Sequence, residues 1–212
     1  MFRDRERFIF YMDNYSAQNK NWTLYTAMVS EVNRMEGPQE IIFRYLEPGH
    51  TFMSADSFLA QVEKCMRERK HVYDEDDFTS IINAKGSAVP MSPADFIMYE
   101  NGVSQGKYTN KPLLCEVQEV RFNKGSTMLY WKSSIDDTEY SSGEFLKKKI
   151  AERIMRCGHE VTFPRLQTAH RIQDKKKNDI LTKLCKFMPA NRHAFWERFA
   201  VNDGSVDLID NY

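Results

Sequence analysis

Two acidic residues, Asp13 and Asp56, occupy positions where a metal-binding site would need them. Asp13 directly follows the apolar run at residues 8–12, and Asp56 lies in the first turn of a predicted helix at 54–69. Carboxylates are the hard oxygen ligands that Mg²⁺ takes in phosphoryl-transfer sites, where one metal ion activates the attacking oxygen and another stabilises the leaving oxygen. We therefore predict that Asp13 and Asp56 are catalytic metal ligands for Mg²⁺ or Mn²⁺.

Hydrogen-bonding side chains crowd the segment after Asp13. Amides can order water or contact a phosphate, and a lysine can neutralise one. His50, which precedes Asp56 by six positions, is a candidate proton carrier or phosphate contact. The predicted phosphate or nucleic-acid contacts in this segment are Asn14, Gln18, Asn19 and Lys20.

Each of these residues also has a simpler explanation. Asp56 near a helix start is favoured by the helix dipole alone. Asp13 and Asn14 are typical of an Asx turn after a strand, and His50 is compatible with an exposed loop. The combination of these residues, and no single one of them, favours a site.

Alternating strands and helices are expected to position the two acids. The apolar pattern predicts a buried strand at 8–12, a helix at 22–35, a strand at 40–46 and the helix at 54–69. Short connections between such elements predict an α/β fold in which a right-handed crossover joins two parallel strands. Both acids would then lie at the same end of the sheet, where α/β proteins bind ligands.

The rest of the chain predicts an α+β extension and a helical C-terminus. Asn123 to Ser126 has the composition of a hairpin turn, and a change of apolar phase predicts a bulge near Gln118 and Glu119. The acidic run at 74–77 is expected to cap a helix. The other expected elements are a short helix from Asp77, a helix start at Ser92, strands at 113–122 and 127–133, and helices at 174–188 and 191–199. We predict three regions, at 1–70, 71–135 and 136–212.

Two stretches, DNYSAQNKNW and YLEPGHTFMSAD, resemble the second half of an RNase-H-like domain found in transposon-derived proteins of animals. Later stretches (VQEVRFNKGS, FLKKK and KKKNDILTKLCKFMP) are similar too, so the resemblance covers most of the chain. It implies the fold of DDE-type transposases and integrases, which cut and join DNA with two Mg²⁺ ions. Asp13 then matches the second acid of that family, and Asp56 the third.

The sequence departs from the family pattern in two places. Ala17 stands where the family usually has glycine, and the strand that carries the first acid should lie upstream of residue 8. Asp4 is too close to the strand at 8–12 to replace that acid. The expectation is a carboxy-terminal part or a decayed copy of a transposase, inactive as this chain. The alternatives are a non-catalytic nuclear module that binds DNA or protein, and an RNase-H-like nuclease in which His50 transfers a proton.

Composition limits the partners. Thirty basic and thirty acidic residues cancel, so DNA would have to bind a local basic patch. Two lysine clusters are candidates, although solvated helix faces explain both. Four widely spaced cysteines favour a reduced, intracellular protein, nuclear or cytoplasmic and not secreted. No apolar run reaches membrane-spanning length. The clusters are Lys147, Lys148 and Lys149, and Lys175, Lys176 and Lys177.

Overall fold

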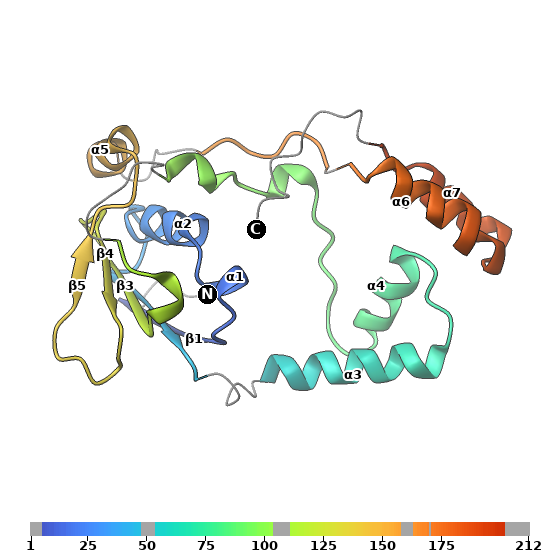
Figure 1. Ribbon diagram of the computed structural model, residues 1–212, viewed down its shortest axis with the longest axis horizontal. Helices are drawn as coiled ribbons and strands as arrows, with labels where there is room; N and C mark the ends of the chain where they lie inside the picture. The colour runs from blue at the N-terminus through green and yellow to red at the C-terminus, as the bar shows by residue number, and fades with distance from the viewer. Residues whose placement is uncertain (1–5, 48–53, 104–110, 158–162, 170, 202–212) are drawn as a thin grey trace. The chain divides into compact units, whose positions relative to one another are not determined.

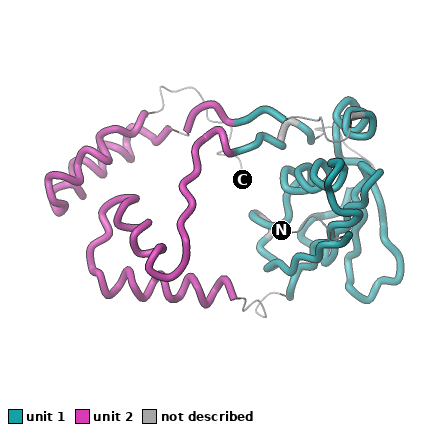
Figure 2. The backbone as a smooth tube through the Cα atoms, turned by 180° about the vertical axis from the view of Figure 1, so that it is seen from behind, with its two compact units in different colours: residues 1–51, 96–165 teal, residues 52–95, 166–212 magenta. Residues whose placement is uncertain are grey.

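The chain forms two compact units in a computed structural model (Figure 2). The first unit comprises residues 1–51 and 96–165, and the second comprises residues 52–95 and 166–212. The predicted three-region division stays a prediction. The structure describes residues 6–47, 54–103, 111–157, 163–169 and 171–201.

A five-stranded mixed sheet, in the order β1-β2-β3-β4-β5, organises the first unit (Figure 1). Strand β1 (Arg7–Met12) is parallel to β2 (Glu40–Tyr45), whereas β3 (Glu119–Asn123), β4 (Leu129–Lys132) and β5 (Ser141–Gly143) continue the sheet antiparallel. The α/β class and the parallel pair are confirmed. The RNase-H-like assignment stays a prediction.

Helix α2 (Trp22–Val32) connects β1 to β2, after the single turn α1 (Ser16–Asn19). Asn21 caps α2, because its side chain accepts a hydrogen bond of 2.8 Å from the N–H of Leu24. Helix α2 ends at Val32, earlier than the predicted end at residue 35. The next residue, Asn33, donates from its side-chain amide to the Val29 carbonyl at 2.8 Å. The side chain of Asn33 therefore takes over a carbonyl that the helix leaves without an amide partner.

The β3–β4 hairpin has the two features predicted for it. Gly125 in the turn has φ +79°, which glycine adopts without steric cost. The N–H of Gln118 donates to Lys132 O at 2.9 Å, while its carbonyl accepts from the N–H of Tyr45 at 2.9 Å. Because Glu119 is also paired with Lys132, two residues of one strand lie opposite one residue of β4, the arrangement of a β-bulge, in agreement with the bulge predicted there. Strand β3 begins later than predicted, because Leu114–Glu116 form a 3₁₀ turn.

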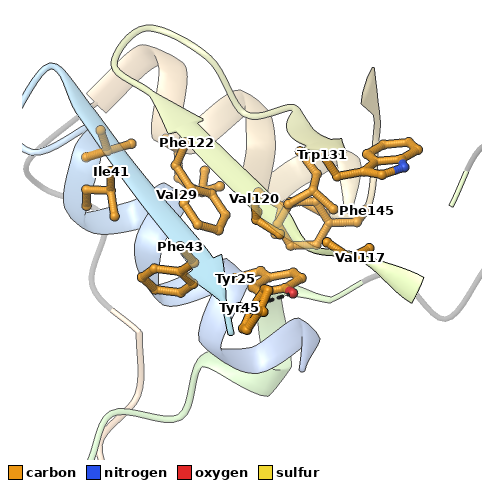
Figure 3. Packing of buried hydrophobic residues seen from close by; sticks show 14 residues of the cluster. Tyr25, Val29, Ile41, Phe43, Tyr45, Val117, Val120, Phe122, Trp131 and Phe145 are labelled. Atoms are coloured by element: carbon orange, nitrogen blue, oxygen red, sulfur yellow. Dashed lines mark hydrogen bonds between the residues drawn. The ribbon is translucent and has the colours of Figure 1, made fainter. Parts of the chain in front are cut away.

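The core lies between one face of the sheet and α2 (Figure 3). Phe122 of β3 is fully buried, with its ring 5.5 Å from that of Phe43 and 5.7 Å from that of Tyr25. Helix α5 (Lys148–Cys157) adds the buried Ile154 to this cluster. The other buried members include Val29, Val32, Ile41, Tyr45, Val117, Val120, Leu129, Trp131, Phe145 and Leu146.

Strand β1 is exposed, and the prediction that it is buried was wrong. Ile9, Phe10 and Tyr11 are 40%, 47% and 56% exposed. The reason is its place in the sheet: within the described ranges β1 pairs with β2 alone, at the edge. An apolar run predicts a strand but not the number of neighbours that cover it.

The opposite face of the sheet is charged. Glu119 is buried there and accepts hydrogen bonds from Arg44 Nε, at 2.6 Å, and from the hydroxyl of Tyr140. Burial raises the pKa of Glu119, but the bonds from Tyr140 and Arg44 outweigh it and hold that pKa below its ordinary value. Arg121 stacks over the Tyr140 ring at 4.1 Å. Each charge on this face therefore has a partner of opposite sign or an aromatic ring.

The second unit is helical. Helices α3 (Ser54–Arg69) and α4 (Glu75–Asn83) were both predicted. The helix expected from Ser92 is only a 3₁₀ turn, Pro93–Asp95, since Asp95 Oδ2 accepts from both the N–H and the hydroxyl of Ser92. Near the C-terminus, α6 (Asp174–Asp179) continues into π and 3₁₀ turns through Phe187, and α7 (His193–Glu197) follows. None of the helices described is long and apolar enough to cross a membrane.

An ion-pair network joins the two sequence segments of this unit. Asp74 caps α4, as predicted, by accepting from the N–H of Asp77 at 3.1 Å. Arg192 donates to Asp74 Oδ2 at 2.7 Å and to Asp77 Oδ1 at 3.1 Å. Arg69 also donates to Asp77 Oδ1, at 3.0 Å. The acidic run is therefore a structural element of this unit.

Candidate functional site

Asp13 lies directly after β1, at the end where the parallel strands β1 and β2 both finish. Its Oδ1 accepts from the N–H of Tyr15 at 3.2 Å and from the side-chain amide of Asn19. No described residue donates to Oδ2. The turn thus holds the carboxylate by one oxygen and leaves the other open to a ligand.

Two core tyrosines fix the residue that orients Asp13. The hydroxyl of Tyr45 donates to the Asn19 carbonyl at 2.8 Å and lies 3.0 Å from the hydroxyl of Tyr25 (Figure 3). Burial raises the pKa of both tyrosines, so both hydroxyls stay protonated. A hydrogen-bonded chain therefore runs from the core through Asn19 to Asp13.

Sequence reasoning missed Tyr25 and Tyr45 as supporting residues. A tyrosine at a core-facing position is a usable signal, because a buried phenol nearly always finds a hydrogen-bond partner. The sequence does not identify that partner, since Tyr45 and the Asn19 carbonyl meet only through the pairing of β1 with β2.

Lys20 is almost completely buried, with 3% of its surface exposed. Its Nζ donates to the Cys115 carbonyl at 3.2 Å and lies 4.8 Å from the centre of the Tyr45 ring. Burial lowers its pKa. These contacts make Lys20 a packing residue beside the site. To contact a phosphate, its ammonium group would have to leave the Cys115 carbonyl and the Tyr45 ring. Its predicted phosphate contact stays a prediction.

The amides near Asp13 divide into two groups. The side chain of Asn19 is engaged with Asp13. Asn14 is half-buried and Gln18 is exposed, and the side chain of neither forms a hydrogen bond within the described segments. The side-chain amides of Asn14 and Gln18 are thus available to hydrogen-bond a ligand at this end of the sheet.

The other predicted site residues lie elsewhere in the chain. Asp56 is exposed in the first turn of α3, which belongs to the second unit. His50 lies outside the described residues. The shared site of Asp13, Asp56 and His50 therefore stays a prediction.

The donors for a metal ion are few. Within the part of the chain that the structure describes, no group of three acidic, histidine or cysteine side chains could hold one. At the end of β1, Asp13 is the carboxylate with an oxygen that no described residue engages. Mg²⁺ keeps several waters and is usually held by one or two carboxylates plus substrate phosphates. Asp13 alone fits one ligand position of such a site and does not complete it.

The lysine clusters differ in their roles. Lys177 Nζ donates to the carbonyls of Glu197 and Phe199, both at 2.7 Å, and so satisfies the end of α7. Lys175 and Lys176 are exposed. The exposed cluster of Lys147, Lys148 and Lys149 begins α5.

Comparison of the chain with protein-family models, with curated proteins and with solved structures gives no significant match. The likeness to transposon-derived proteins therefore depends on the sequence stretches alone, and the function of the chain is a matter for proposal.

Proposed function

We propose that this chain is a transposon-derived, RNase-H-like module whose ancestral activity is Mg²⁺-dependent cleavage and transfer of DNA strands. In this chain the proposed remnant of that activity is weak binding of Mg²⁺ or Mn²⁺ at Asp13, without DNA cleavage. One observation supports it above the others: Asp13 follows a strand of a parallel pair and presents a carboxylate with one unengaged oxygen.

The surroundings of Asp13 support a preformed ligand position. Met12 pairs with Tyr45 at the carboxyl ends of β1 and β2, the region where open α/β sheets bind ligands. The amide of Asn19 orients the carboxylate, as an outer partner does for a ligating side chain in metal sites. When bound, a divalent cation would supply charge stabilisation for a phosphate. Asp13 would bind the cation, and Asn19 would orient the Asp13 carboxylate.

The absence of cleavage follows from the same geometry. Two-metal strand cleavage needs several oxygen ligands around two ions. Within the described residues, no group of three acidic, histidine or cysteine side chains that could hold a metal ion lies here. We therefore expect binding of a cation without turnover.

Replacement of Asp13 by asparagine is expected to weaken Mn²⁺ binding by about tenfold or more, the lower end of what loss of a supporting partner costs a metal site. Asparagine keeps the acceptor for Asn19 and Tyr15, so the turn should keep its shape while the charge is lost. The measurement is a Mn²⁺ titration followed by electron paramagnetic resonance, with Mg²⁺ as the competitor.

Asp136→Asn provides the matched control, because Asp136 is an exposed aspartate of the same unit. Its Mn²⁺ affinity should equal that of the unsubstituted chain. Asp56→Asn tests the second predicted ligand in the same titration. If Asp13→Asn and Asp56→Asn both bind Mn²⁺ as the unsubstituted chain does, the metal-site proposal is wrong.

A second candidate function, non-catalytic DNA binding, is favoured by the surface of α5. Lys149, Arg153 and Arg156 are exposed and follow each other at helical spacing, so they share one side of the helix. The opposite side of α5 packs into the core through Ile150 and Ile154. A rigidly mounted row of cations is the form in which proteins contact phosphate backbones.

Replacing Lys149, Arg153 and Arg156 together by glutamine should weaken DNA binding equally for all sequences. Each lost phosphate contact should reduce the salt slope of log K by about 1. The measurement is a DNA mobility shift at several salt concentrations. Lys175→Gln with Lys176→Gln is the control and should bind DNA normally, as should Asp13→Asn. Loss of binding only in the Lys175 and Lys176 variant would move the interface away from α5.

A further inference from the structure

Strand β1 presents an open set of backbone hydrogen-bonding groups. Glu6 O accepts from the N–H of Glu40 at 3.0 Å, and Met12 O accepts from the N–H of Leu46 at 2.9 Å. Backbone groups alternate in direction along a strand, so the even-numbered residues face β2. Arg7, Ile9 and Tyr11 therefore direct their N–H and C=O groups to the other side, where no described strand pairs with them.

The side chains of β1 are apolar on both faces. Phe10 shares the core face with its register partner Phe43, with ring centres 5.7 Å apart, yet remains about half exposed. On the opposite face, Ile9 and Tyr11 are similarly exposed. Monomeric proteins usually protect such an edge with a lysine, a proline or an inward-pointing charge. Residues 8–12 contain none of these.

The sequence of β1 is complementary to itself in the antiparallel direction. If Phe10 lies opposite Phe10 of a second copy, Ile9 lies opposite Tyr11, and their outward backbone groups face each other as a hydrogen-bonded pair. The same register places Phe8 opposite Met12. It also brings Arg7, which pairs with Glu40 of its own chain, opposite Asp13, so opposite charges lie at both ends of an uncharged centre.

We propose that a second copy of this chain pairs with β1 along its open edge, antiparallel and with the two-fold axis at Phe10. The two five-stranded sheets then form one continuous sheet with an isologous interface, the commonest symmetry of soluble dimers. Backbone hydrogen bonds provide the attraction, as in other strand additions to a sheet edge. The contacts of Phe10 with Phe10 and of Ile9 with Tyr11 select the register, and Arg7 opposite Asp13 avoids like charges at the ends.

Cysteine cross-linking tests this register directly. In the proposed dimer, Phe10 faces itself as a non-hydrogen-bonded pair, with Cα atoms about 4.5 Å apart, within the range that a disulfide spans. Phe10→Cys should therefore yield a disulfide-linked dimer on mild oxidation, mapped by peptide mass spectrometry. Ile9→Cys is the matched control and should yield none, because Ile9 faces Tyr11. The unsubstituted chain, which carries only the native cysteines, should form no disulfide-linked dimer under the same oxidation.

Light scattering over a dilution series is the second measurement, and it needs no cysteine. The unsubstituted chain should be dimeric, and Ile9→Pro should be monomeric with an unchanged circular dichroism spectrum. Proline at position 9 removes an outward N–H and spares the bonds to β2. A monomeric unsubstituted chain, or a link through Ile9→Cys in place of Phe10→Cys, overturns the proposal.

Discussion

Replacing Arg192 with alanine is expected to destabilise the second unit by about 3 kcal/mol, the cost of breaking a buried ion pair from one side. Arg192 bridges Asp74 and Asp77, and both carboxylates are almost completely buried. Without the guanidinium, Asp74 loses its only described cation, while Asp77 keeps Arg69. Asp74 is then a buried carboxylate without a described cation, and its desolvation cost is no longer offset.

Urea unfolding followed by circular dichroism measures this effect, and hydrogen exchange at the amides of α4 locates it. Arg67→Ala is the control, because Arg67 pairs with Glu63 at 3.4 Å where both side chains are exposed. An exposed pair of this kind is worth about 0.5 kcal/mol or less. Equal destabilisation by the two substitutions would show that the Arg192 network does not hold the unit together.

Replacing Phe122 with alanine is expected to cost the first unit about 4 kcal/mol, in the range measured for buried phenylalanines. Phe122 is completely buried in the core. Its ring packs against Phe43 of β2 and Tyr25 of α2, so its loss leaves a cavity between sheet and helix. The pairing of β2 with β3 limits how far the backbone can close that cavity.

Urea unfolding again gives the free energy, with Phe187→Ala as the matched substitution. Phe187 is 73% exposed, so its loss should change stability by less than about 0.5 kcal/mol. If Phe122→Ala does not fold, Phe122→Leu keeps most of the volume and should cost about 1 kcal/mol. A cost for Phe122→Ala as small as that for Phe187→Ala would contradict the packing of this core.

Local patterns predicted many of the elements correctly. The alternation of apolar strands with an amphipathic helix led to the parallel pair of β1 and β2 around α2. The cap at Asp74, the hairpin turn with Gly125 and the bulge at Gln118 were also visible in the sequence. Each of these depends on residues close together in the chain, where side-chain chemistry acts on the adjacent backbone.

The burial of individual residues could not be predicted in the same way. Lys20 is buried because the Cys115 carbonyl and the Tyr45 ring reach it from distant parts of the chain. Leu59 of α3 is 56% exposed although its side chain is apolar. Position in the sequence does not determine which elements cover a residue, so polarity alone misplaces both residues.

By itself, the sequence determined the parallel strands β1 and β2 around α2 and the candidacy of Asp13, since both follow from local polarity and spacing. Only the tertiary structure decided that β1 is an exposed edge strand and that Asn19, supported by Tyr45 and Tyr25, orients Asp13. The physical reason is that burial and long-range hydrogen bonds depend on which segments become neighbours. Residues 19 and 45 meet through strand pairing, and no local pattern encodes that contact.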